Sequence, residues 1–210
     1  MTQPLPPQQG LALPTLMVVL SVASLAALLA WRNLGVNDQL LNAEADQLRT
    51  QRQAEAVLPL AVQDIVSNAP SHLRHTMGSS TDTHAFFPNT LAEYAVLQQR
   101  VGAARCQSGI CVSLGSVTAT PQKASDWKAQ THTAIAIGAA DSPYGANTAW
   151  YWVEVFPGEN TGAFVYRVTT LAQGVLPSST SVLQAIWQRD TSVGPTSLTG
   201  KWHSWHALHD

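Results

Sequence analysis

The chain has 210 residues, enough for one domain with a substantial core even after an N-terminal apolar segment is set aside. Charged residues make up 11% of it, well below the roughly 25% usual in soluble domains, and the formal net charge is -2. This balance gives no electrostatic case for binding nucleic acid or anionic lipid, so no nucleic-acid partner is predicted.

An uncharged apolar run, Leu11–Trp31, follows Gly10, and the first charged residue after it is Arg32. Its 21 residues would span about 32 Å as a helix, the thickness of a bilayer core. The run is longer than the apolar region of a secretory signal, and residues 1–10 contain no Lys or Arg. We therefore expect a transmembrane helix over 11–31 that stays with the mature protein.

Beyond the membrane, residues 32–68 are expected to continue the same helix in amphipathic form. The apolar positions that keep helical spacing are Leu34, Leu41, Ala45, Leu48, Leu58, Val62 and Ile65. The result would be one helix of about 55 residues, half in lipid and half amphipathic. A simpler interpretation is a membrane anchor followed by a juxtamembrane coiled coil.

Three places along this helix carry residues that disfavour it. Gly35, just outside the membrane, predicts a local softening, and Pro59 predicts a kink or a break. Asn68 to Pro70 is expected to end the helix.

Residues 69–210 are expected to form a globular domain with an antiparallel sheet, which makes the chain α+β. Alternation and β-branched or aromatic content predict four strands, Thr133–Ala139, Trp150–Phe156, Phe164–Leu171 and Ser181–Arg189. A short helix is predicted over Leu91–Val101, and a connecting loop over Asp141–Asn147.

The two cysteines, Cys106 and Cys111, enclose four residues including Gly109. We expect them to form a disulfide in an oxidising compartment, the alternative being two free buried thiols. Two cysteines with no histidine nearby cannot make a structural zinc site.

The tail carries His203, His206 and His209 three residues apart, and neighbouring pairs could share a metal. The simpler interpretation is a polar, partly frayed C-terminus with incidental histidines, so no metal is predicted. Trp202 and Trp205 beside them suggest that the tail docks on another surface, for which the protein's own sheet is one candidate. No catalytic or dinucleotide motif is found, so neither an enzyme activity nor a cofactor is predicted.

The short leader ending in Gly10, the apolar run and the continuing helix resemble a type IV pilin-like protein. The resemblance implies cleavage by a prepilin peptidase after Gly10, which leaves Leu11 as the new N-terminus. Most pilins carry Glu at the fifth mature position, and here that position is Thr15. The chain is most similar in this to the PilX-type minor pilins and to the K-type minor pseudopilins of type II secretion.

Two further stretches are similar to PilX-type proteins, the helical segment Gln51–Ala61 and the closing strands Phe164–Arg189. The family also contains a short loop closed by two cysteines. The resemblance implies a pilin-like α+β fold, in which the amphipathic half of the long helix packs on a C-terminal antiparallel sheet.

The resemblance further implies a non-catalytic minor pilin that helps to initiate and cap the type IV pilus. In the family the fifth-position Glu is thought to pair with the N-terminal amine of a neighbouring subunit, because a buried carboxylate is costly unless paired. Thr15 cannot offer that charge, which favours a place at the filament tip; the alternative is simple drift, with the Thr hydroxyl bonding its own helix. The implied partners are other minor pilins, the major pilin, prepilin peptidase, the inner membrane and a large tip adhesin.

The expected location is the inner membrane, crossed once, with a periplasmic C-terminal domain that later reaches the extracellular pilus tip. The expected disulfide favours this orientation, whereas Arg32, Arg49 and Arg52 would favour the cytoplasm by the positive-inside rule. Two other functions stay open, a K-type minor pseudopilin and a membrane-anchored periplasmic enzyme or binding protein. The last would have a pocket with convergent polar groups.

Overall fold

The structure is a computed structural model, and it describes residues 12–67, 85–112, 123–138, 148–158, 164–176, 178–190 and 199–208. The chain divides into two compact units, Met1–Glu44 and Ala45–Asp210. Gly10, Leu11, the segment 68–70 and the loop Asp141–Asn147 lie outside the described residues.

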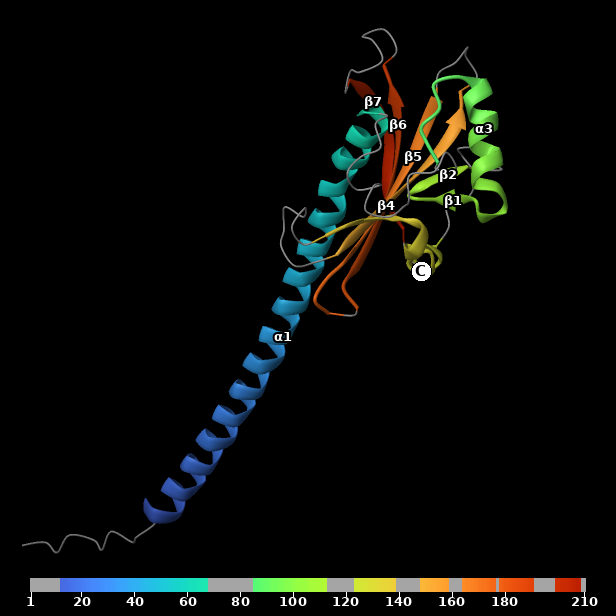
Figure 1. The fold of residues 1–210 in the computed structure, drawn as a ribbon. Helices are drawn as coiled ribbons and strands as arrows, with labels where there is room; N and C mark the ends of the chain where they lie inside the picture. The colour runs from blue at the N-terminus through green and yellow to red at the C-terminus, as the bar shows by residue number, and fades with distance from the viewer. Residues whose placement is uncertain are drawn as a thin grey trace, which may run out of the picture. The chain divides into compact units, whose positions relative to one another are not determined.

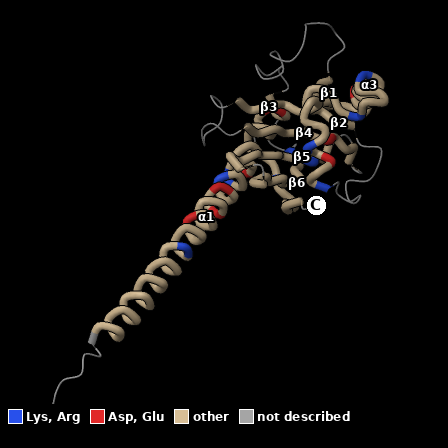
Figure 2. The backbone as a smooth tube through the Cα atoms, turned by 90° about the horizontal axis from the view of Figure 1, so that it is seen from below, with Lys and Arg blue, Asp and Glu red and all other residues tan. Residues whose placement is uncertain are grey.

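The first unit consists of the N-terminal part of α1, a helix that runs from Ala12 to Ser67. Its described side chains up to Asn42 are exposed, and its most apolar stretch has a mean hydropathy of 2.3. Figure 2 shows that the N-terminal turns carry no Lys, Arg, Asp or Glu. By length and composition α1 could span a membrane once.

The long helix expected from the sequence is present, and it is continuous through Gly35 and Pro59. The predicted break at Pro59 is therefore wrong. Pro59 is exposed, whereas Val57 and Ala61 on either side of it are buried. Burial of these neighbours offsets the loss of one helical hydrogen bond, which is why the helix continues.

The predicted apolar stripe of α1 is buried in its last part only: Val62 and Ile65 are buried and Leu58 packs against the core. Leu34, Leu41 and Leu48 are 64, 63 and 50% exposed. The buried side chains after Ala45 are Asp46, Thr50, Gln53, Ala54, Val57, Ala61, Val62, Asp64, Ile65 and Val66. The apolar pattern was wrong at Leu48, because the buried side chains in that part of the helix, Asp46, Thr50 and Gln53, are polar.

The second unit contains one seven-stranded sheet in the order β1-β2-β4-β5-β6-β7, with β3 pairing to β4 off this path. The strands are β1 Cys106–Gln107, β2 Ile110–Val112, β3 Ile135–Ile137, β4 Ala149–Pro157, β5 Phe164–Gln173, β6 Thr180–Arg189 and β7 Gly200–Leu208. Figure 1 shows β4, β5 and β6 as long neighbouring strands. All four predicted strands are present, the first of them shortened to three residues.

The sheet is mixed, which corrects the purely antiparallel sheet expected from the sequence. β2 pairs with β4 in parallel, and every other pairing is antiparallel among the described strands. The parallel partners are far apart in sequence, Ile110 opposite Val153, so short turns between neighbouring strands could not reveal this pairing.

Helices cover both faces of the sheet. On one face, α1 after Ala45 buries a core with β3–β6 that includes Ile65, Tyr151 and Trp187. On the other, α4 (Ala124–Ala129) packs its Trp127 against Trp152. The predicted short helix is α3, with the expected bounds Leu91–Val101. Helix α4 was not predicted, because six residues are too few to show a period.

Candidate functional site

The structure describes one of the three residues proposed for processing and assembly. Thr15 lies in the first turns of α1, and its side chain is exposed, as are those of its described neighbours. It therefore lies on a surface that another chain or a membrane can reach.

Cys106 and Cys111 lie opposite each other in the β1–β2 hairpin and form a disulfide. The turn contains Ser108 and Gly109, both with positive φ, at 48° and 75°. The Gly109 N–H donates to the carbonyl of Thr133 at 2.7 Å, and its carbonyl accepts from the N–H of Val153 at 2.7 Å. The hairpin is thus bonded to the sheet through its turn.

The C-terminal tail is a strand, not a frayed end. β7 pairs with β6 along its length up to Leu208, so the predicted fraying is wrong for these residues and docking on the protein's own sheet is confirmed. His203 accepts or donates a 3.0 Å hydrogen bond between its Nε2 and Oε1 of Gln188. His209 lies outside the described residues, which hold no metal-ligating group of three acidic, His or Cys side chains.

A register shift in β7 places two tryptophans on one side of the sheet. Trp202 pairs with Trp187 and Trp205 pairs with Ala185, so His203 and Ser204 share the one intervening β6 position, Ile186. Residues three apart would otherwise point to opposite faces. Trp202 and Trp205 are 43 and 58% exposed and line an open groove of about 520 Å³ with Glu55, Leu58 and Ala185.

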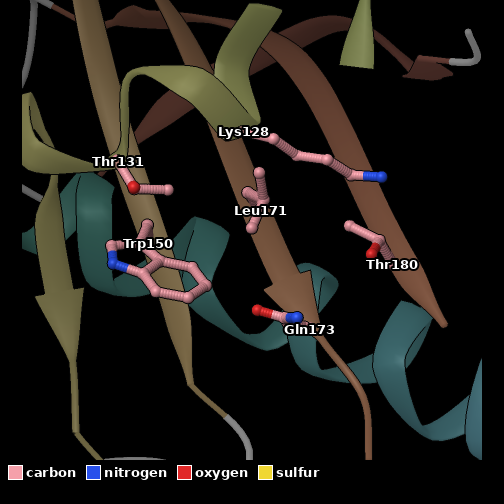
Figure 3. Close-up of a pocket in the computed structure, with 6 residues that line it drawn as sticks. All are labelled: Lys128, Thr131, Trp150, Leu171, Gln173 and Thr180. Atoms are coloured by element: carbon pink, nitrogen blue, oxygen red, sulfur yellow. The ribbon is translucent and has the colours of Figure 1, made fainter. Parts of the chain in front are cut away.

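A second hollow lies on the opposite face of the sheet and has a volume of about 290 Å³. Strand register brings four of its lining residues together, since Trp150 is opposite Leu171 and Gln173 is opposite Thr180. Figure 3 shows the ring of Trp150 and the side chain of Thr180 on either side of Leu171, with Lys128 extended above Leu171 toward Thr180.

Lys128 and Thr131 line this hollow from α4 and from the short helix η2 (Thr131–Thr133). The rings of Trp127 and Trp152 lie 4.9 Å apart, and the indole N–H of Trp152 donates to Oγ1 of Thr133 at 3.0 Å. These contacts fix the segment that carries Lys128 above the sheet. The pocket was not foreseen, because its residues come from four separate parts of the chain.

Two buried ionisable clusters elsewhere in the second unit are held by hydrogen bonds. Arg167 donates from Nε and Nη2 to both carboxylate oxygens of Glu154, at 2.5 and 2.9 Å. Asp46 accepts from the backbone N–H groups of Val175 and Leu176, at 3.2 and 2.9 Å. The Leu176 N–H, followed by the Ser179 hydroxyl, lowers the pKa of Asp46.

The fold and these surfaces define an α+β protein with one long, largely exposed N-terminal helix and a disulfide-closed hairpin at one edge of its sheet. No family model matches the chain, and neither the curated proteins nor the solved structures contain a match.

Proposed function

We propose that the protein is a PilX-type minor pilin, which helps to initiate and cap a type IV pilus at the filament tip and has no catalytic role. The observation that carries the proposal is the single helix α1. Its first part is apolar and exposed, and its last part, after Ala45, forms the core of a domain. A subunit needs both properties if it is to be held in a membrane and then packed among other helices.

Two exposed features support an assembly role. Leu34, Leu41 and Leu48 lie seven residues apart on α1, the spacing of a seam that packs against another helix. Trp202 and Trp205 add an exposed apolar patch at the edge of the sheet, and such patches on soluble domains mark contact surfaces. Other pilin subunits are the partners we assign to these surfaces.

Processing tests the proposal directly. The full chain would be expressed with and without a prepilin peptidase, and its intact mass measured in each case. We expect the peptidase to remove residues 1–10 and leave Leu11 as the first residue. A Gly10→Val variant is the matched control and should keep its full mass. A wild-type mass unchanged by an active peptidase would contradict the assignment.

The tip location rests on Thr15 and has its own test. Thr15→Glu should leave the thermal unfolding of the protein unchanged, because the side chain is exposed on α1. The new carboxylate can pair with a neighbouring N-terminal amine, so we expect tagged protein to move from filament ends to positions along the filament. Immunogold labelling would show this, and a Thr15→Gln variant, which lacks the charge, should stay at the ends. Labelling of wild-type protein along the whole filament would contradict the tip assignment.

A membrane-anchored binding protein remains the second candidate, since the hollow beside Trp150 has the convergent polar groups that this alternative requires. It predicts no cleavage after Gly10, so the peptidase experiment separates the two functions.

A further inference from the structure

The hollow on the sheet face opposite α1 combines an apolar floor with an aromatic wall. Leu171 is 2% exposed and forms the floor, and Trp150 is half-buried beside it. The face of an indole ring is electron-rich, and it attracts C–H groups that carry a small positive charge. One face of a sugar ring presents such C–H groups, so the Trp150 wall suits a ring of this kind.

The polar groups around this floor can both donate and accept hydrogen bonds. Gln173 supplies an amide, and Thr131 and Thr180 supply hydroxyl groups. A sugar hydroxyl also donates and accepts, so each of these side chains can pair with it in either sense. A hydrocarbon ligand would leave all three without a partner, at a cost in free energy.

Lys128 gives the hollow a positive charge. The residue is exposed, and its side chain extends above Leu171 toward Thr180 (Figure 3). The part of the chain that the structure describes offers Lys128 no carboxylate partner within 4.0 Å. A ligand with an acidic group would form a charge-assisted hydrogen bond there, which a neutral sugar cannot.

We propose that the hollow formed by Lys128, Thr131, Trp150, Leu171, Gln173 and Thr180 binds an acidic monosaccharide, a sugar ring that carries a carboxylate. Its volume of about 290 Å³ is just below the usual range for ligand pockets, which fits one sugar unit, free or at the end of a polysaccharide. The proposal goes beyond assembly, and it stands whether or not the protein is a pilin.

Saturation-transfer NMR on the full chain would test this site, in micelles of a detergent without a sugar headgroup. The probes are sodium glucuronate, glucose and sodium acetate, which offer ring and charge together, the ring alone and the charge alone. We expect saturable glucuronate binding with a Kd in the range of about 1–10 mM, about fivefold weaker binding of glucose, and no binding of acetate. A short uronic-acid oligomer that binds tighter than glucuronate would show that a polysaccharide end is the source of the sugar.

Variants locate the binding. Lys128→Gln should weaken glucuronate binding about fivefold and leave glucose binding unchanged, because it removes the charge alone. Trp150→Ala should abolish binding of both sugars. Trp205→Ala, which removes an exposed tryptophan from a different surface, is the matched control and should bind like the wild type.

Three results would overturn the proposal: no saturable binding of glucuronate, equal binding of acetate, or full binding by a folded Trp150→Ala variant. Trp150 contributes to packing, so each variant needs a thermal unfolding measurement. If Trp150→Ala does not fold, the site is tested with Lys128→Gln and Gln173→Ala, because both residues are exposed and their substitution should leave the fold intact. Unchanged glucuronate binding in both variants would refute the site.

Discussion

Asp46 joins α1 to the loop between β5 and β6. It is 6% exposed and accepts backbone hydrogen bonds from Val175 and Leu176. A Cβ on Gly174 would lie 2.6 Å from Oδ2 of Asp46 and 2.5 Å from Oγ1 of Thr50, so the close approach of this loop requires glycine. A polar residue on the buried face thus fixes the position of a loop nearly 130 residues away.

Asp46→Asn should destabilise the domain at neutral pH by about 1–2 kcal/mol, because an amide accepts at one atom where the carboxylate accepts at two. The pKa of Asp46 is lowered in the folded state. The carboxylate's contribution is therefore complete above about pH 4 and is lost as the pH falls through the folded-state pKa. Denaturant unfolding at several pH values would show the wild type and the variant converging in acid.

The matched control is Asp38→Asn, which removes an exposed carboxylate of the same helix. It should change the unfolding free energy little at any pH. An Asp46→Asn effect that stayed constant down to pH 2 would contradict a role for the charge.

At the scale of elements, sequence patterns predicted the long helices and the long strands that pair with their neighbours in sequence. α1, α3 and the strands β4, β5 and β6 are close to the expected positions, since each shows a clear helical or alternating pattern. β7 was missed because its register shift at His203 disrupts the alternation and its first eight residues are exposed. β1 and β2 were missed because two or three residues show no period and the β2 partner lies far along the chain.

The same limits applied to the candidate site. The disulfide followed from the spacing of Cys106 and Cys111 alone, as a local property. The hollow around Trp150 depends on strand register and on α4, and no sequence pattern placed Lys128 above Leu171. Long-range register decides what such a pocket contains, so it could be found only in three dimensions.

The turn of the β1–β2 hairpin requires a glycine at position 109. Gly109 has a φ of 75°, and a Cβ there would lie 2.6 Å from Cγ1 of Ile135. Gly109→Ala should therefore lower the unfolding free energy by about 2–4 kcal/mol, from backbone strain and overpacking together. Thermal and denaturant unfolding would measure the loss.

Gly102→Ala separates these two causes. Gly102 also has a positive φ, of 54°, but a Cβ there would meet nothing within 4 Å. The Gly102→Ala substitution should lower the free energy of unfolding by about 1 kcal/mol, from backbone strain alone. If the two variants lost equal stability, the contact between Gly109 and Ile135 would have no energetic importance.

For the whole molecule, the division at Glu44 and Ala45 predicts that residues 1–44 can be removed without unfolding the second unit. A chain that begins at Ala45 retains Asp46 and every buried residue of α1. It should be soluble without detergent and should unfold cooperatively. Circular dichroism and thermal unfolding in buffer would check this, and aggregation of the purified fragment would contradict it.

A chain that begins at Leu58 is the corresponding negative control. It lacks Ala54 and Val57, and it leaves part of the core cluster open to water. We expect this fragment to aggregate or stay unfolded, because the sheet loses the apolar surface that covers it.

The attachments of α1 to the sheet also have a mechanical consequence. Asp46 bonds the β5–β6 loop, the carbonyl of Ala54 accepts from Thr170 at 2.9 Å, and the carbonyl of Ile65 accepts from Arg189 at 2.8 Å. These attachments are spread over about 28 Å of helix. A pull along the helix axis loads all of them in shear at the same moment, whereas a sideways pull would break them one after another. The domain should therefore resist tension along α1 better than tension across it.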